Sequence, residues 1–175
     1  ISTHGSRKGL TDIALNTGQW DEALKRASRY CSVDPSQSLP SSLAAFELGQ
    51  HTDATAYFLH GVLNHPKATC LLHDVRTPEP TSYEEQEDWN LGVSVCRRLH
   101  AYLAQRRPGS KAFFRRLLKH PHLHALQQRI VEAEAKWEGE RMGGASDTLR
   151  LLDRMRKIGF ARQEAPHLLD SDSAK

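Results

Sequence analysis

The sequence predicts an all-α protein made of stacked antiparallel helical hairpins, with about seven or eight helices. One observation is a segment that recurs at a spacing of 31 residues with its turn residues in matching places. A second is that apolar residues elsewhere recur at the spacing of one helix face, and no stretch shows the alternation typical of a strand. With 175 residues, 38% of them hydrophobic and 26% charged, the chain is long enough to bury one continuous core.

The repeat aligns residues 17–35 with residues 48–66 without a gap. Four pairs of identical residues stand 31 positions apart: Gly18 and Gly49, Gln19 and Gln50, Ala23 and Ala54, and Pro35 and Pro66. Each glycine is expected to turn the chain sharply between two antiparallel helices, and each alanine to permit their close approach. Each proline is expected to end the second helix of its hairpin.

The first copy resembles the tetratricopeptide repeat family, because Gly18, Trp20, Ala23 and Pro35 match that family's glycine, aromatic, alanine and proline positions. In the second copy, His51 takes the aromatic position. The resemblance implies a helical-repeat protein that holds other macromolecules.

This chain departs from the family pattern in two places. Thr11 stands where glycine is usual, and the spacing of 31 is shorter than the usual repeat of about 34 residues. Residues 36–42, which include Pro40, are expected to take up the difference and to cap a short helix over residues 42–48.

After the repeats, residues 77–88 predict a loop whose acids precede a helix N-terminus, where negative charge is favourable. Residues 89–105 predict one helix, and Ser110 is expected to cap a short helix over residues 110–118. The apolar face expected in the first of these consists of Val93, Cys96, Leu99 and Leu103.

Two further helices are predicted at the C-terminal end. One follows the apolar residues Leu123, Leu126, Ile130, Ala133 and Trp137 and ends near Gly143 and Gly144. The other covers residues 146–158, with Gly159 expected to stop it and Phe160 to fold back on Met155.

The predicted organisation is a single compact unit. Residues 1–76 form the helical-repeat hairpins, residues 77–88 the acidic loop, residues 89–169 the basic helical segment with the C-terminal helices, and residues 170–175 a frayed tail.

The charge distribution is the strongest indication of function. Residues 91–131 contain nine bases and no acid, although the whole chain has a net charge of only +3. Lys111, Arg115 and Lys119 share one helix face, which is typical of a surface that contacts phosphates; the alternative is an ordinary solvated face. The candidate nucleic-acid-binding residues are Arg97, Arg98, Arg106, Arg107, Lys111, Arg115, Arg116, Lys119 and Arg129.

No residue pattern predicts an enzyme, a cofactor or a metal site. The sequence has neither a glycine-rich phosphate loop nor a nucleophile elbow or zinc-protease motif. His120, His122 and His124 follow Lys119 closely, but alternate residues diverge on a helix, and Cys70 with His73 supplies only half a zinc site. We therefore expect no catalytic residues, no metal, no cofactor and no small-molecule substrate.

A weaker resemblance covers about half of the chain. The helix expected after Leu39 and Pro40, followed by residues 52–72 and a helix rich in Leu, Tyr and Arg over residues 99–107, is similar to the repeat region of the ribosome quality control subunit family. That resemblance implies non-enzymatic docking on a large ribosomal subunit. Organellar RNA-associated helical-repeat proteins and bacterial tetratricopeptide adaptors resemble the chain comparably.

The functional expectation is a non-catalytic scaffold or adaptor subunit of a larger, RNA- or ribosome-associated assembly, with protein subunits as partners. The alternative is a peptide-binding adaptor with no role in nucleic-acid binding. The expected location is a reducing compartment, either the cytoplasm or an organelle matrix such as the mitochondrion, because three unpaired cysteines suit free thiols. The sequence begins at Ile1, as a processed chain would, and no segment is apolar enough to predict membrane insertion.

Overall fold

The computed structural model describes residues 3–140 and 146–170, and this part of the chain is helical with no strand. Its helices are α1 (Thr3–Asn16), α2 (Trp20–Ser28), α3 (Ser38–Glu47), α4 (His51–Asn64), α5 (Pro66–Leu72), α6 (Tyr83–Arg98), α7 (His100–Gln105), α8 (Ser110–Leu118), α9 (Pro121–Glu140), α10 (Ser146–Met155) and α11 (Ile158–Leu169). The all-α prediction is confirmed. The predicted number of seven or eight helices is too low, because the described residues contain eleven α-helices and a short 3-10 turn.

The two expected turns have the same geometry. Gly18 and Gly49 have φ values of 77° and 75°, in the left-handed region that favours glycine. The amide of Gly18 donates to the Leu15 carbonyl, and the amide of Gly49 donates to the Phe46 carbonyl, so each turn closes the helix before it in the same way. The sequence pattern therefore located two turns between helices correctly, one between α1 and α2 and one between α3 and α4.

The prediction that each proline ends a helix holds for Pro66, since α4 ends at Asn64, but not for Pro35, because α2 already ends at Ser28. Pro35 opens the 3-10 turn (Pro35–Gln37) and Pro66 opens α5, so both prolines begin helices, where a missing amide costs nothing. The short helix predicted over residues 42–48 begins four residues earlier, because α3 starts at Ser38 and contains Pro40 in its first turn.

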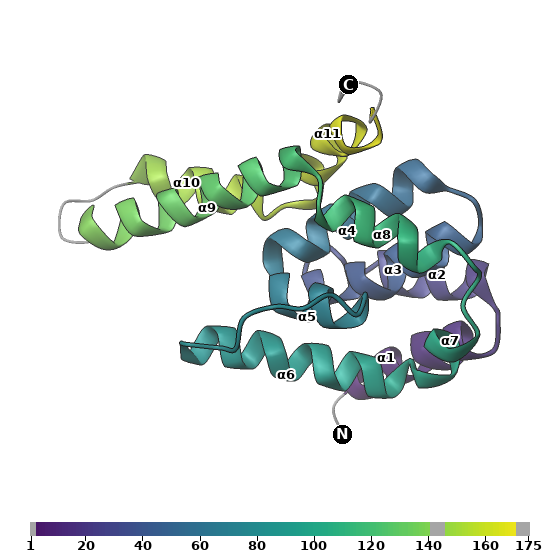
Figure 1. The fold of residues 1–175 in the computed structure, drawn as a ribbon. Helices are drawn as coiled ribbons and strands as arrows, with labels where there is room; N and C mark the ends of the chain where they lie inside the picture. Colours follow the sequence, from purple (N-terminus) through teal and green to yellow (C-terminus); the bar gives the residue numbers. More distant parts are fainter. Residues whose placement is uncertain (1–2, 141–145, 171–175) are drawn as a thin grey trace.

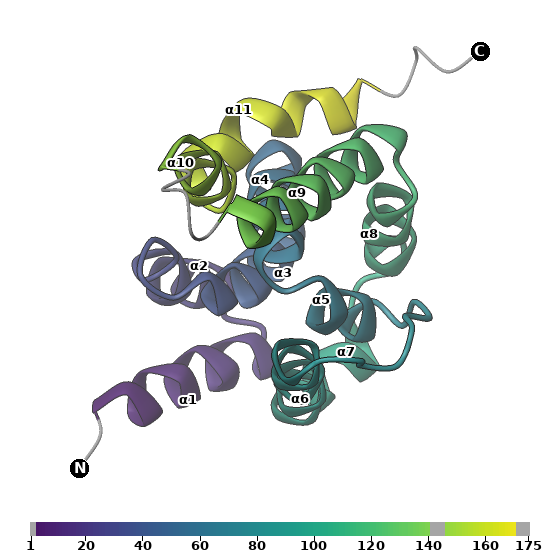
Figure 2. The same ribbon diagram turned by 90° about the vertical axis from the view of Figure 1, so that its left-hand side faces the viewer.

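Helices α3 and α4 form the centre of the molecule. Figures 1 and 2 show α2, α5, α8, α9 and α11 arranged around them. All residues of α3 and residues 54–63 of α4 are buried, and the hydrophobic core contains residues from α1 through α11. Because of this central position, other helices cover the two helices on several sides, and even polar residues such as Ser38, Ser41 and His60 are buried.

Helices α5 and α6 pack closely because of a glycine. A Cβ atom on Gly92 would lie 2.7 Å from the Ala68 Cα, so no larger residue fits at this contact. Asp88 of α6 accepts hydrogen bonds from the amides of Lys67 (2.7 Å) and Ala68 (3.3 Å), at the first turn of α5. At the start of α6, the Ser82 hydroxyl accepts from the Glu85 amide (3.1 Å), as expected for an acid-rich helix start.

The single helix predicted over residues 89–105 is in fact two helices, α6 and α7, which meet at Leu99. The side-chain amide of Asn16 stabilises the break, because it donates to the Arg98 carbonyl (2.8 Å) and accepts from the Tyr102 amide (3.0 Å). Asn16 is more than eighty residues away in sequence, so local periodicity carries no trace of this contact. The predicted apolar face is also partly wrong, because Val93 is 42% exposed.

Two predicted helix ends also differ. Gly109, with φ of 94°, occupies the N-cap position predicted for Ser110, which is the first residue of α8. The last predicted helix ends at Met155, and Gly159 lies inside α11, which the sequence pattern missed. The expected end of α9 at Gly143 and Gly144 and the tail after residue 170 lie outside the described residues.

The packing of α11 on α4 explains why a helix forms around Gly159 and Pro166. Phe160 and Ala161 of α11 are buried, and Arg162 lies over the Tyr57 ring of α4 at 5.3 Å. Figure 1 shows α9 and α10 extending together away from the other helices. Among the described helices, none is both long and apolar enough to cross a membrane.

Candidate nucleic-acid interface

The nine candidate bases belong to four parts of the fold. Arg97 and Arg98 end α6, Arg106 and Arg107 follow α7, and Arg129 lies on α9. The other four lie on or directly after α8: Lys111, Arg115, Arg116 and Lys119. The structure therefore does not bring all nine onto one element, and α8 carries the largest group.

Three acids from earlier segments pair with four of these bases. Asp12 of α1 lies 3.4 Å from Arg98, and Glu47 of α3 lies 3.3 Å from Arg107. Asp74, after α5, lies 2.7 Å from Lys111 and 3.1 Å from Arg115. The absence of acids within residues 91–131 is therefore partly compensated in the folded chain.

Glu47 is the most buried of these acids, with 3% of its side chain exposed. The Tyr102 hydroxyl donates to its carboxylate at 3.0 Å, and the Arg107 guanidinium also donates to the Glu47 backbone carbonyl at 2.9 Å. Burial and the nearby carboxylate raise the pKa of Tyr102, so this hydroxyl remains a donor. Arg107 thus connects the segment after α7 to α3, which is a structural role.

Asp74 joins the end of α5 to α8. Its φ of 54° lies in the left-handed region, and its carboxylate accepts hydrogen bonds from Lys111 and Arg115. The hydrogen bond and the positive charge of Lys111 lower the pKa of Asp74. Arg115 also donates to the backbone carbonyls of His73 (3.1 Å) and Asp74 (2.7 Å). Lys111 and Arg115 are therefore committed in part to holding α8 in place.

Arg106 is half-buried beside two other buried polar groups. Burial lowers its pKa, and its Nη1 atom has no hydrogen-bond partner among the described residues. Both ring nitrogens of His73 and the Ser110 hydroxyl also have no hydrogen-bond partner among the described residues. Arg106 therefore faces the protein interior more than solvent.

Four of the nine bases are exposed and have no ion pair in the part of the chain that the structure describes. They are Arg97, Arg116, Lys119 and Arg129.

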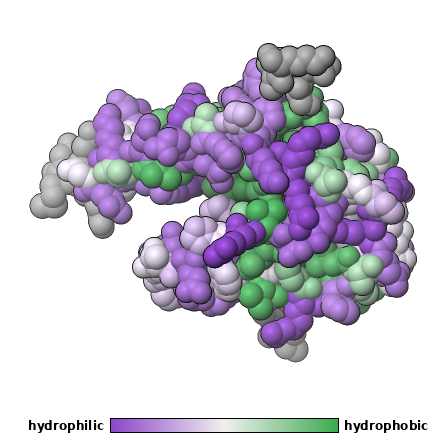
Figure 3. Space-filling view, in the orientation of Figure 1, coloured by the Kyte–Doolittle hydropathy of each residue, from purple (hydrophilic) through white to green (hydrophobic). Residues whose placement is uncertain are grey.

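Two of these exposed bases are neighbours. Arg116 and Lys119, together with Arg115 and His120, line a shallow hollow at the end of α8. The Arg116 guanidinium lies 5.5 Å from the centre of the Phe113 ring. Figure 3 shows strongly hydrophilic residues over α8 on this face. We call Arg115, Arg116, Lys119 and His120 the α8 basic surface.

The neighbouring histidines are held by separate contacts. His122 lies 2.8 Å from Glu164 of α11, and His124 Nε2 lies 2.9 Å from the Leu118 carbonyl oxygen. The His122 amide donates to His120 Nδ1 at 3.1 Å. Within the described residues, no three potential ligands come together as a metal site.

The cysteines are free thiols, of which Cys31 is buried and Cys70 and Cys96 are half-buried. Burial raises the pKa of each thiol. A raised pKa reduces the thiolate fraction, which is the reactive form.

Comparison with known proteins gives no relative: no family model, no curated protein and no solved structure matches this chain.

Proposed function

We propose that this protein is a non-catalytic helical-repeat scaffold or adaptor subunit of a larger assembly, and that it contacts RNA, including ribosomal RNA, through the α8 basic surface. The observation that carries the proposal is the pair Arg116 and Lys119, which remain exposed without an acid partner among the described residues. Exposed guanidinium and ammonium groups contact phosphates in any sequence context.

The proposed architecture is a tetratricopeptide-like stack. Two hairpins with equal turns at Gly18 and Gly49 support it, and Ala23 and Ala54, both fully buried, occupy matching places behind those turns. Hairpins of this kind offer a continuous surface to protein subunits, which are the second class of partner. The proposed location is a reducing compartment, the cytoplasm or an organelle matrix.

The test is binding of a structured RNA of mixed sequence, measured by fluorescence anisotropy over a range of salt concentrations. The Arg116→Ala, Lys119→Ala variant should bind more weakly, and two lost phosphate contacts should reduce the salt slope by about 1.4 to 1.8. The matched control is Arg76→Ala, Arg154→Ala, which removes the same charge from two other exposed positions.

Equal losses in both variants would mean a general effect of net charge, and the α8 basic surface would be rejected. Absence of RNA binding at every salt concentration would instead favour the peptide-binding adaptor. The equal hairpin turns favour that second function, because they imply a protein-binding repeat without any need for RNA.

A further inference from the structure

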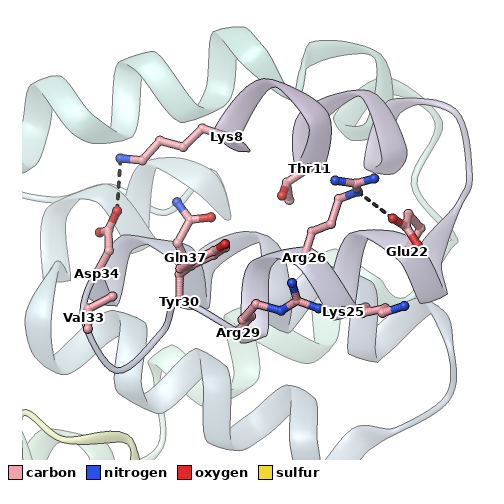
Figure 4. Close-up of a pocket in the computed structure, with 10 residues that line it drawn as sticks. All are labelled: Lys8, Thr11, Glu22, Lys25, Arg26, Arg29, Tyr30, Val33, Asp34 and Gln37. Atoms are coloured by element: carbon pink, nitrogen blue, oxygen red, sulfur yellow. Dashed lines mark ion pairs between the residues drawn. The ribbon is translucent and has the colours of Figure 1, made fainter. Parts of the chain in front are cut away.

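A second candidate site lies in the N-terminal part of the chain, between α1 and α2. A cavity of about 290 Å³ is bounded by Lys8 and Thr11 of α1, by Glu22, Lys25 and Arg26 of α2, and by residues of the segment that follows α2. Figure 4 shows the side chains that line it. Its volume equals that of about ten water molecules, which is enough for a small ligand but not for a folded partner.

The cavity has an excess of positive charge. Lys8 pairs with Asp34 (3.1 Å) and Arg26 pairs with Glu22 (2.6 Å), as the dashed lines in Figure 4 mark. Two other bases of the lining, Lys25 and Arg29, are exposed and have no ion pair among the described residues. They stand four positions apart on α2 and the turn after it, so they share one face and match a ligand with two negative charges.

A largely buried glutamine contributes hydrogen-bonding groups to the cavity. Gln37 is only 7% exposed, and its side chain lines the cavity. In Figure 4 its amide projects into the space between α1 and α2. An amide has two N–H donors and an acceptor oxygen, so Gln37 can both donate to and accept from a group placed in the cavity.

We propose that this cavity binds a small phosphomonoester, with Lys25 and Arg29 holding the phosphate and Gln37 contacting a hydroxyl group and an oxygen of the ligand. A phosphomonoester carries close to two negative charges at neutral pH and three acceptor oxygens, which suits the two unpaired bases. The hydroxylated part of the ligand offers a donor and an acceptor to the Gln37 amide. This site shares no residue with the α8 basic surface, so each proposal stands or fails alone.

The test is a titration of the protein with ribose 5-phosphate, with inorganic phosphate and with ribose, followed by 1H–15N NMR at constant ionic strength. Ribose 5-phosphate should give saturable shifts confined to residues around the cavity and to the Gln37 side-chain amide. That amide is identified by its absence from the spectrum of Gln37→Met. Ribose should give no shifts, and inorganic phosphate should bind more weakly than the sugar phosphate.

The Lys25→Ala, Arg29→Ala variant should bind ribose 5-phosphate about tenfold or more weakly. Gln37→Glu keeps the size of the side chain but repels the phosphate, so it should also lose binding. Arg76→Ala, Arg154→Ala is the control and should bind as the unmodified protein does.

Three results would overturn the proposal. One is a complete absence of saturable shifts with ribose 5-phosphate. Another is binding in which the Gln37 amide does not move. The third is equal affinity for inorganic phosphate and ribose 5-phosphate, which would indicate a plain anion site and reject the phosphomonoester.

Discussion

His73 should make the protein sensitive to acid. Its ring is fully buried, stacked on Phe114 with ring centres 4.5 Å apart and tilted against Phe58 at 5.8 Å. Burial, together with the positive charges of Arg106 and Arg115, lowers its pKa from 6.5 to about 3. The imidazole is therefore neutral in the folded protein across the ordinary pH range.

The sign of the effect follows from proton binding. Below about pH 6.5 the unfolded chain takes up a proton at His73 that the folded chain does not. The free energy of unfolding therefore falls as the pH falls from 6.5 toward 3, by about 1.4 kcal/mol per pH unit. Between about pH 7 and about pH 4.5 the loss due to His73 amounts to about 2.5 kcal/mol.

The assay is urea unfolding followed by circular dichroism at several pH values in this range, for the unmodified protein and for His73→Phe. The other titrating groups, including His60, whose pKa burial also lowers, are present in both proteins. The difference between the two free energies of unfolding therefore isolates His73. Any misfit of the slightly larger phenyl ring adds an offset that does not depend on pH.

We expect the variant to gain about 2.5 kcal/mol relative to the unmodified protein on going from about pH 7 to about pH 4.5. At neutral pH it should be at least as stable, because the substitution removes two buried nitrogens that have no partner among the described residues. A difference that stays constant over the whole range would refute the reasoning, because it would mean that His73 binds protons equally well in both states.

Two further predictions concern stability. Gly92→Ala should lower the free energy of unfolding by about 1–3 kcal/mol, because its Cβ would meet the Ala68 backbone at 2.7 Å, whereas Gly159→Ala, with open space around it, should be neutral or slightly stabilising. Urea unfolding measures both, and equal effects would contradict the close packing of α5 on α6. Arg107→Ala should cost about 1–2 kcal/mol in the same assay, because it leaves the buried Glu47 carboxylate with fewer partners, and should leave RNA binding unchanged. A loss of RNA affinity without a loss of stability would instead indicate that Arg107 contacts RNA.

The turns show what short-range patterns can predict. Gly18 and Gly49 were located from the repeat alone, because a left-handed residue after a helix has a strong and local sequence preference. The apolar positions of α9 were predicted equally well, since Leu123, Leu126 and Ile130 are all buried.

Helix boundaries and charge pairing depended on distant residues. Asn16 stabilises the break between α6 and α7, and contact with α4 stabilises α11 despite Gly159 and Pro166. The cavity between α1 and α2 left no sequence signal either, because Lys25, Arg29 and Gln37 match no motif.

The sequence by itself determined that this chain is all helical, where its first two hairpins turn and that its middle segment is basic. These properties depend on backbone preferences and on the periodicity of side chains within a few turns of a helix. Only the tertiary structure decided which bases remain available to a partner. Asp12, Glu47 and Asp74 are far from residues 97–115 in sequence, yet folding brings them within 4 Å of four of the bases, because ion pairing depends on distance in space.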